Sequence, residues 1–191
     1  MPLTTRPAVL QAFQALGWQK TGRGQDARLH LDLPDRTVSV IPHLSQLPDS
    51  MVLRLHENVS TQRFDEGFQA VDGSQNTRPM VPLILRGGRR AKHPHVTATV
   101  IADEAARLIE WAAGHDLDAL YAGFRNLPTD AVGSQPLYHL VALGLQGDVT
   151  RLTGYLDAFR AGDRLSFVPY ITEDMVARAL TLAETTAERA D

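Results

Sequence analysis

The sequence contains no cysteine, and this absence excludes several kinds of chemistry. Disulfide bonds, zinc sites with cysteine ligands, iron–sulfur clusters and thiol catalysis are all ruled out. The chain also has no apolar run near the ~18 residues that a membrane-spanning helix needs. Its first ten residues lack the apolar core of a signal peptide. These absences predict a soluble, cytoplasmic protein that does not contact membranes.

Catalytic and cofactor motifs are also missing once their context is considered. Residues 22–27 fit the loose dinucleotide pattern G-x-G-x-x-A, but they follow a predicted helix and precede a predicted strand, so no helix N-terminus would face a pyrophosphate. Ser134 lacks the second glycine of a nucleophile elbow and is explained as a helix cap. The sequence therefore indicates no catalytic residue, no cofactor and no resident metal.

Lysine is scarce, with two lysines against seventeen arginines, which is typical of a GC-rich bacterial genome. The charge is unevenly distributed along the chain. Residues 1–102 carry 12 Lys/Arg and 8 Asp/Glu, whereas residues 103–191 carry 7 Lys/Arg and 14 Asp/Glu. Such asymmetry can steer a partner, or it can reflect attraction between the two halves of the chain.

The 191 residues, 43% apolar and 21% charged, are enough for one globular core. Alternating apolar side chains predict five strands, at 27–33, 37–41, 51–57, 81–86 and 95–101. Helical spacing predicts helices along Val9–Leu16, at 61–71 and at 104–113, followed by four more with caps at Asp116, Ser134, Asp148 and Thr172. We therefore predict an α+β fold: a twisted antiparallel sheet at 1–114, in α-β-β-β-α-β-β-α order, with a C-terminal helical extension at 115–191 packed on the same core.

This order of elements resembles the type III secretion chaperone-like fold over residues 1–114. The resemblance is carried by the apolar stripe Val9–Leu16, the five strands and the helices at 61–71 and 104–113, and not by any residue motif. It implies a non-enzymatic protein, a homodimer, that holds an extended segment of a partner. The helical region 116–191 has no counterpart in that family, and no binding residue can be carried over.

The run Arg86–His93 is the sharpest local feature. It places two glycines and four permanent positive charges, Arg86, Arg89, Arg90 and Lys92, in the predicted connection between the last two strands. Glycines let backbone N–H groups converge, and arginines bind carboxylate or phosphate. The run predicts an anion grip on an acidic partner protein, or a solvated hairpin loop that discourages aggregation at a sheet edge. Nucleic acid is disfavoured, because no aromatic residues interleave the charges.

Three histidines, His30, His56 and His95, are predicted on the polar face of the sheet, flanked by Arg54. If their strands are neighbours, they could converge on a metal or a small ligand. The alternative is that they are scattered surface histidines.

The preferred function is binding of a specific partner protein, as a chaperone, an adaptor or an immunity-type neutraliser. The alternative is an enzyme, or a protein that binds a metal or small ligand on the polar face of the sheet. A third hypothesis is weak nucleic-acid binding through the basic run.

Overall fold

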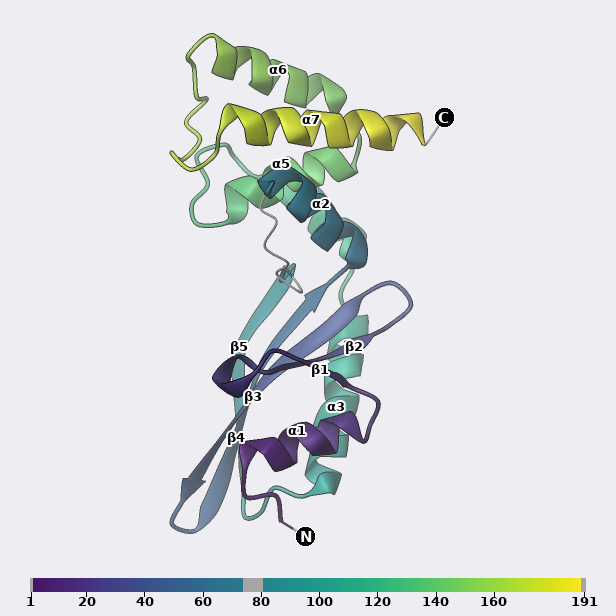
Figure 1. The fold of residues 1–191 in the computed structure, drawn as a ribbon, viewed down its shortest axis with the longest axis vertical. Helices are drawn as coiled ribbons and strands as arrows, with labels where there is room; N and C mark the ends of the chain where they lie inside the picture. The colour runs from purple at the N-terminus through teal and green to yellow at the C-terminus, as the bar shows by residue number, and fades with distance from the viewer. Residues whose placement is uncertain (1, 74–80, 190–191) are drawn as a thin grey trace. The chain divides into compact units, whose positions relative to one another are not determined.

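Two compact units make up the chain in the computed structural model, which describes residues 2–73 and 81–189, without the side chains of residues 87 and 89. The sheet unit comprises Met1–Thr61 and Pro82–His115, and the helical unit comprises Gln62–Val81 and Asp116–Asp191. Each unit is thus built from two separate stretches of the chain, and the chain passes from one unit to the other three times (Figure 1).

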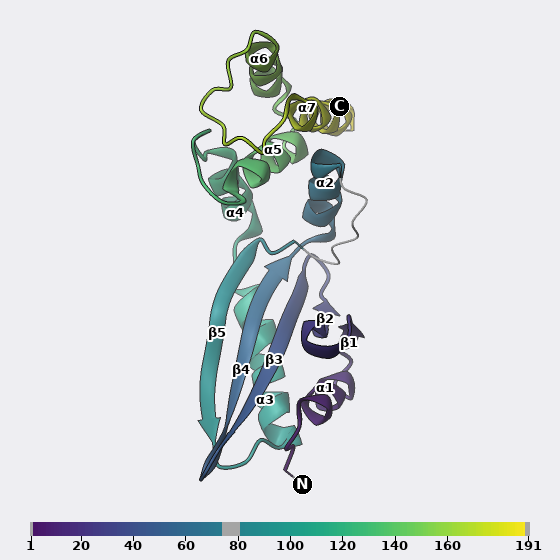
Figure 2. The same cartoon turned by 60° about the vertical axis from the view of Figure 1, so that its left-hand side comes forward.

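A five-stranded antiparallel sheet, in the order β1-β2-β3-β4-β5, forms the centre of the sheet unit. Its strands are β1 (Gln19–Thr21), β2 (Arg28–Asp32), β3 (Thr37–Leu47), β4 (Ser50–Ser60) and β5 (Ile84–His93), and the short helix η1 (Gly24–Asp26) precedes β2. β3 and β4 form a long hairpin, paired from Leu47↔Ser50 at the turn to Thr37↔Ser60. Figure 2 shows β3, β4 and β5 running side by side.

One face of this sheet carries the core of the sheet unit, which it shares with α1 (Arg6–Gln14) and α3 (Ala98–Ala113). Successive side chains of a strand point to opposite faces, so alternate residues reach this core. The buried residues of the core include Phe13, Leu29, Val38, Val40, Leu53, Leu55, Ile101 and Leu108. We call the opposite face, which carries His43 and Ser45 of β3, Arg54 and His56 of β4, and Arg90 of β5, the open face.

The predicted α+β class is confirmed, including an antiparallel sheet followed by C-terminal helices. The strand predicted at 95–101 is wrong, because this segment leads into α3. The hydroxyl of Thr97 accepts a hydrogen bond from the N–H of Val100 at 3.3 Å and caps that helix. β-branched residues favour a strand locally, but tertiary packing overrides that preference in this segment. Val96 and Ile101 are fully buried in the core. β1 is a further strand that the sequence analysis does not predict. With β1 added and the strand at 95–101 absent, the observed order is α-β-β-β-β-α-β-α.

The helical unit contains α2 (Gln62–Asp72), α4 (Leu117–Arg125), α5 (Gln135–Leu145), α6 (Val149–Arg160) and α7 (Glu173–Glu188). Side chains of Asp116, Asp148 and Thr172 cap α4, α6 and α7 as predicted, whereas Ser134 holds the N-cap position of α5 without a side-chain hydrogen bond. Within the described residues, no helix is both long enough and apolar enough to cross a membrane.

The division between the units differs from the predicted boundary at residue 115 in one respect. The helical unit does resume at Asp116, but it also includes residues 62–81. Aromatic contacts explain why α2 belongs there: the ring of Phe64 lies 5.3 Å from that of Tyr138 and 6.1 Å from that of Phe124. The apolar stripe of α2 can be seen in the sequence, but the stripe alone cannot predict which helices pack against it.

A fully buried histidine joins α5 to α4 and α6. Nδ1 of His139 lies 3.0 Å from the carbonyl oxygen of Phe124, and Nε2 lies 3.1 Å from the hydroxyl of Tyr155. Because a carbonyl oxygen only accepts, Nδ1 carries the proton, and the neutral Nε2 accepts from the Tyr155 hydroxyl. Burial lowers the pKa of His139 below its ordinary value of 6.5.

We therefore expect the helical unit to lose stability as the pH falls below 6.5. In that window the unfolded chain binds a proton on this imidazole and the folded chain does not, so protonation favours unfolding. Urea unfolding at several pH values measures the effect through the four tyrosines, all of which lie in the helical unit. His139→Gln should remove this part of the pH dependence, and His30→Gln, in the sheet unit, should leave it. An unchanged pH dependence in His139→Gln would contradict the assignment.

Candidate functional site

The basic run lies in β5, at the edge of the sheet, and not in a connecting loop as predicted. β5 pairs with β4 from Val59↔Ile84 to Met51↔His93. An irregularity of the register between Leu55 and Glu57 marks a β-bulge on this pair. This shift puts Arg86 opposite Glu57 on the core face of the sheet, whereas Arg90 and Lys92 lie opposite Arg54 and Val52 on the open face.

Arg86 is held on the core face of the sheet. Its Nη1 lies 3.8 Å from Oε2 of the fully buried Glu57, and its guanidinium lies 6.0 Å from the ring centre of Trp111. Arg107 of α3 binds the other oxygen of Glu57 and also donates to Glu104 Oε2 at 2.7 Å. Arg86, whose side chain is 49% exposed, therefore belongs to an ion cluster around the buried Glu57.

Arg90 and Lys92 are two exposed positive residues of β5. The register pairs Arg90 with Arg54 and Lys92 with Val52, which places both on the open face. Arg89 pairs with Leu55 through its backbone, and its side chain lies outside the described residues. Of the four predicted anion-binding residues, Arg90 and Lys92 are thus brought together on one exposed surface.

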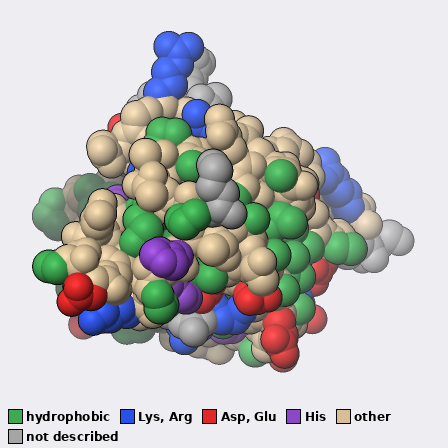
Figure 3. Space-filling view, turned by 90° about the horizontal axis from the view of Figure 1, so that it is seen from below, with side chains coloured by type: hydrophobic (Ala, Val, Ile, Leu, Met, Phe, Trp, Pro, Cys, Tyr) green, Lys and Arg blue, Asp and Glu red, His purple; other side chains and the backbone are tan. Residues whose placement is uncertain are grey.

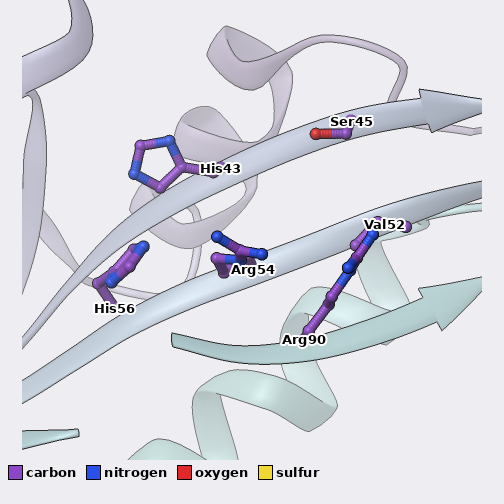
Figure 4. Close-up of a pocket in the computed structure, with 6 residues that line it drawn as sticks. All are labelled: His43, Ser45, Val52, Arg54, His56 and Arg90. Atoms are coloured by element: carbon purple, nitrogen blue, oxygen red, sulfur yellow. The ribbon is translucent and has the colours of Figure 1, made fainter. Parts of the chain in front are cut away.

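A pocket of about 280 Å³ opens beside Arg90 on the open face. It is lined by His43, Ser45, Val52, Arg54, His56 and Arg90 (Figure 4). The rings of His43 and His56 lie 5.1 Å apart and nearly perpendicular, at 85°. Three adjacent strands supply the lining, because the register sets His43 opposite Arg54 and Arg54 opposite Arg90. We call this the open-face pocket.

Gly88 gives Arg54 the space that it occupies in the pocket. A Cβ atom at Gly88 would lie 2.7 Å from Cγ of Arg54 and 3.2 Å from Cε1 of His56. Real Cβ contacts are not so short, so any larger residue would displace the arginine. The second glycine of the basic run thus shapes the pocket, a role different from the backbone convergence predicted for a loop.

The open-face pocket is strongly cationic. No carboxylate lines it, and within the described residues neither Arg54 nor Arg90 makes a hydrogen bond or an ion pair. Partial burial, together with the charges of His56, Arg6 and Arg54, lowers the pKa of His43 below its ordinary value of 6.5. The positive groups therefore repel one another, and a bound anion would relieve that repulsion.

The structure does not bring His30, His56 and His95 together. His30 lies on β2 opposite Ser39, and the exposed His95 lies between β5 and α3 because the strand predicted there is absent. His56 instead neighbours His43. Among the described residues no group of three or more His, Asp or Glu side chains could hold a metal ion. Histidine side chains do reach the surface, as the space-filling view shows (Figure 3), without forming such a group.

A family model matches residues 5–184, from the start of α1 into α7. The chain belongs to DUF6990, a family of unknown function. The match spans both units and includes the open-face pocket. No curated protein and no solved structure matches the chain significantly.

Sequence reasoning misses His43, which supplies one side of the pocket. Pro42 and Pro48 suggest a loop over this region, whereas β3 continues through Pro42 to Leu47. The alternation His43, Ser45, Leu47 after Val38 and Val40 is the signal that could have extended the strand.

Proposed function

We propose that this protein binds a partner protein without catalysing a reaction, and that it holds an extended, acidic segment of that partner along β5. This activity is chaperone-, adaptor- or immunity-like. One observation carries the proposal: β5 is the last strand of the sheet, and its side chains Arg90 and Lys92 are exposed. An edge strand offers unpaired N–H and C=O groups to which a further strand can add.

Charge complementarity favours an acidic segment as the occupant. A strand added to β5 would place alternate side chains next to Arg90 and Lys92, where aspartate or glutamate is attracted and a basic residue is repelled. Arg54 lies beside them on β4 and adds to the attraction. Leu85, which is 68% exposed at the other end of β5, supplies an apolar contact.

The resemblance to the type III secretion chaperone-like fold supports the same function, since proteins of that fold hold extended segments of their partners. It also leads us to propose a homodimer. We place the protein in the cytoplasm, because a chain without cysteine suits a reducing compartment.

Affinity capture with the full chain tests the proposal. The wild-type chain is expected to retain one specific protein from a native lysate of the source organism. Reversing two charges in Arg90→Glu/Lys92→Glu should reduce that recovery at least about tenfold, because like charges then face the acidic segment. The matched control is Lys20→Glu/Arg23→Glu, which makes the same charge change at exposed sites at the opposite side of the sheet.

The captured protein should also contain an acidic stretch whose synthetic peptide competes for binding. Equal recovery by the β5 variant and the control, or no enriched protein with the wild-type chain, would argue against the proposal.

A further inference from the structure

The open-face pocket shares Arg90 with β5, but its other charged and polar groups come from β3 and β4. Two guanidinium groups and two imidazoles surround it, and its volume of about 280 Å³ is small. Pockets for drug-sized ligands measure roughly 300–1,000 Å³, so this one suits a small ion or the end group of a larger molecule. A serine hydroxyl, that of Ser45, adds a further polar group to the lining.

We propose that the open-face pocket binds a small oxyanion of the phosphate or sulfate type, and that His43 and His56 make this binding depend on pH. The site stands on the face of the sheet and needs no partner strand on β5, so the proposal is independent of the protein-binding function above.

The arginines supply the fixed part of the site. A guanidinium presents several N–H donors in a planar fork that matches the oxygens of phosphate, and it stays charged at every relevant pH. Arg54 and Arg90 are paired across β4 and β5, so their side chains start from adjacent points of the sheet. Figure 4 shows Arg54 beside His43 and His56, with the side chain of Arg90 extending toward Val52.

The imidazoles supply the part that responds to pH. A neutral imidazole has one N–H donor, whereas the protonated ring has two and carries a positive charge. Arg54 and Arg90 line the pocket with the two histidines, and Arg6 of α1 also acts on His43. Lys92 of β5 and His30 of β2 lie further away on the same face. The one carboxylate whose position in the strands falls on this face, that of Asp32, accepts a hydrogen bond from Thr37 near the end of the sheet.

Burial, with the positive charge of Arg6 and Arg54, works against protonation of His43 in the empty pocket. A dianion reverses the sign of the local field at His43, so that this imidazole gains a proton when the anion binds. Anion binding and protonation of His43 therefore support each other, and the affinity rises as the pH falls.

Sulfate is the decisive probe, because its charge stays constant across this pH range while that of phosphate does not. The full chain is titrated with sulfate, and the imidazole Cε1–H signals of His43 and His56 are followed by NMR. We expect saturable shifts of both rings, with a dissociation constant that is about tenfold larger near pH 8 than near pH 6. Shifts that do not saturate, or an affinity that is the same at both pH values, would overturn the proposal.

Variants distinguish specific binding in the pocket from non-specific attraction of sulfate to a positively charged surface. Arg54→Gln and Arg90→Gln should each weaken sulfate binding several-fold or more, whereas the exposed Arg23→Gln should not. His43→Gln/His56→Gln should abolish the pH dependence and keep weak binding through the arginines. Equal losses in Arg23→Gln and Arg90→Gln would refute a specific site. Because Arg90 lies on the surface, its variant remains informative even if Arg54→Gln fails to fold.

Two further titrations show where the oxyanion comes from. Inorganic phosphate and O-phosphoserine are compared at one pH near 6. Tighter binding of inorganic phosphate indicates a free ion, and binding of O-phosphoserine at least as tight indicates a phosphomonoester carried on a larger molecule. The absence of binding by both, like the absence of binding by sulfate, would overturn the proposal.

Discussion

Replacing Arg107 with methionine is expected to lower the free energy of unfolding of the sheet unit by about 3 kcal/mol, because it removes the charge partner of a buried carboxylate. Glu57 is fully buried, and Arg107 binds its Oε1. Its Oε2 has no hydrogen bond within the described residues and lies 3.8 Å from Arg86. The same guanidinium also donates to Glu104, which is 7% exposed, so Arg107 helps to compensate two buried carboxylates.

Urea unfolding followed by tryptophan fluorescence measures this loss, since both tryptophans of the chain, Trp18 and Trp111, lie in the sheet unit. Adding Glu57→Gln to Arg107→Met should restore part of the stability, because the amide carries no charge to be compensated.

The matched control for Arg107 is Arg160→Met. Arg160 forms a 3.4 Å pair with Glu173 in which both side chains are largely exposed. Such surface pairs contribute about 0–1 kcal/mol, and circular dichroism at increasing urea concentration should show a correspondingly small change. An equally small loss in Arg107→Met would show that the buried cluster adds no more stability than a surface pair.

Phe64→Ala is expected to destabilise the helical unit by about 3–5 kcal/mol, the usual range for removing a buried phenylalanine. Phe64 is fully buried on α2, and its ring contacts those of Tyr121, Phe124 and Tyr138. The alanine would leave a cavity where α2 meets α4 and α5. Native-state hydrogen exchange should show amides of α2 opening about a hundredfold faster or more, which corresponds to ~3 kcal/mol.

Val132→Ala is the control for Phe64. Val132 is 72% exposed in the same unit, and a surface substitution of this kind changes stability by about 0.5 kcal/mol or less. If exchange in α2 rises equally in both variants, the aromatic cluster does not hold α2 in the helical unit.

The first part of the sheet could be predicted because its residues repeat with a period of two. Leu29 and Leu31 of β2, Val38 and Val40 of β3, and Leu53 and Leu55 of β4 alternate with polar side chains, and all belong to the core or pack against it. The signal works because one face of each strand is buried and the other is not.

β5 could not be predicted in the same way. Its sequence contains two glycines and four positive charges, and its strand conformation comes from pairing with β4 along almost its whole length. Local propensity favours a loop there, and it favours a strand at 95–101, where tertiary packing instead produces the start of α3. Contacts between distant segments override local preference at both places.

The candidate site was only partly accessible from the sequence. The sequence already shows that Arg54, His56 and Arg90 carry the charged or imidazole groups that an anion site needs. Their convergence with His43 depends on the register of three strands, which no local pattern contains. The role of Gly88 likewise requires knowing that the Arg54 side chain lies against it.

Because α2 lies between β4 and β5 in the chain, its apolar residues leave the ribosome before most of the helical unit has been synthesised. Phe64, Phe68 and Val71 emerge well before α5 and α7, the helices that α2 contacts, have been made. At ~5–20 residues per second, the roughly 70 residues from the end of α2 to the end of α5 take on the order of ten seconds. For that interval the apolar residues Phe64, Phe68 and Val71 of the nascent chain lack the helices that cover them in the folded unit, and we expect general folding factors to bind there.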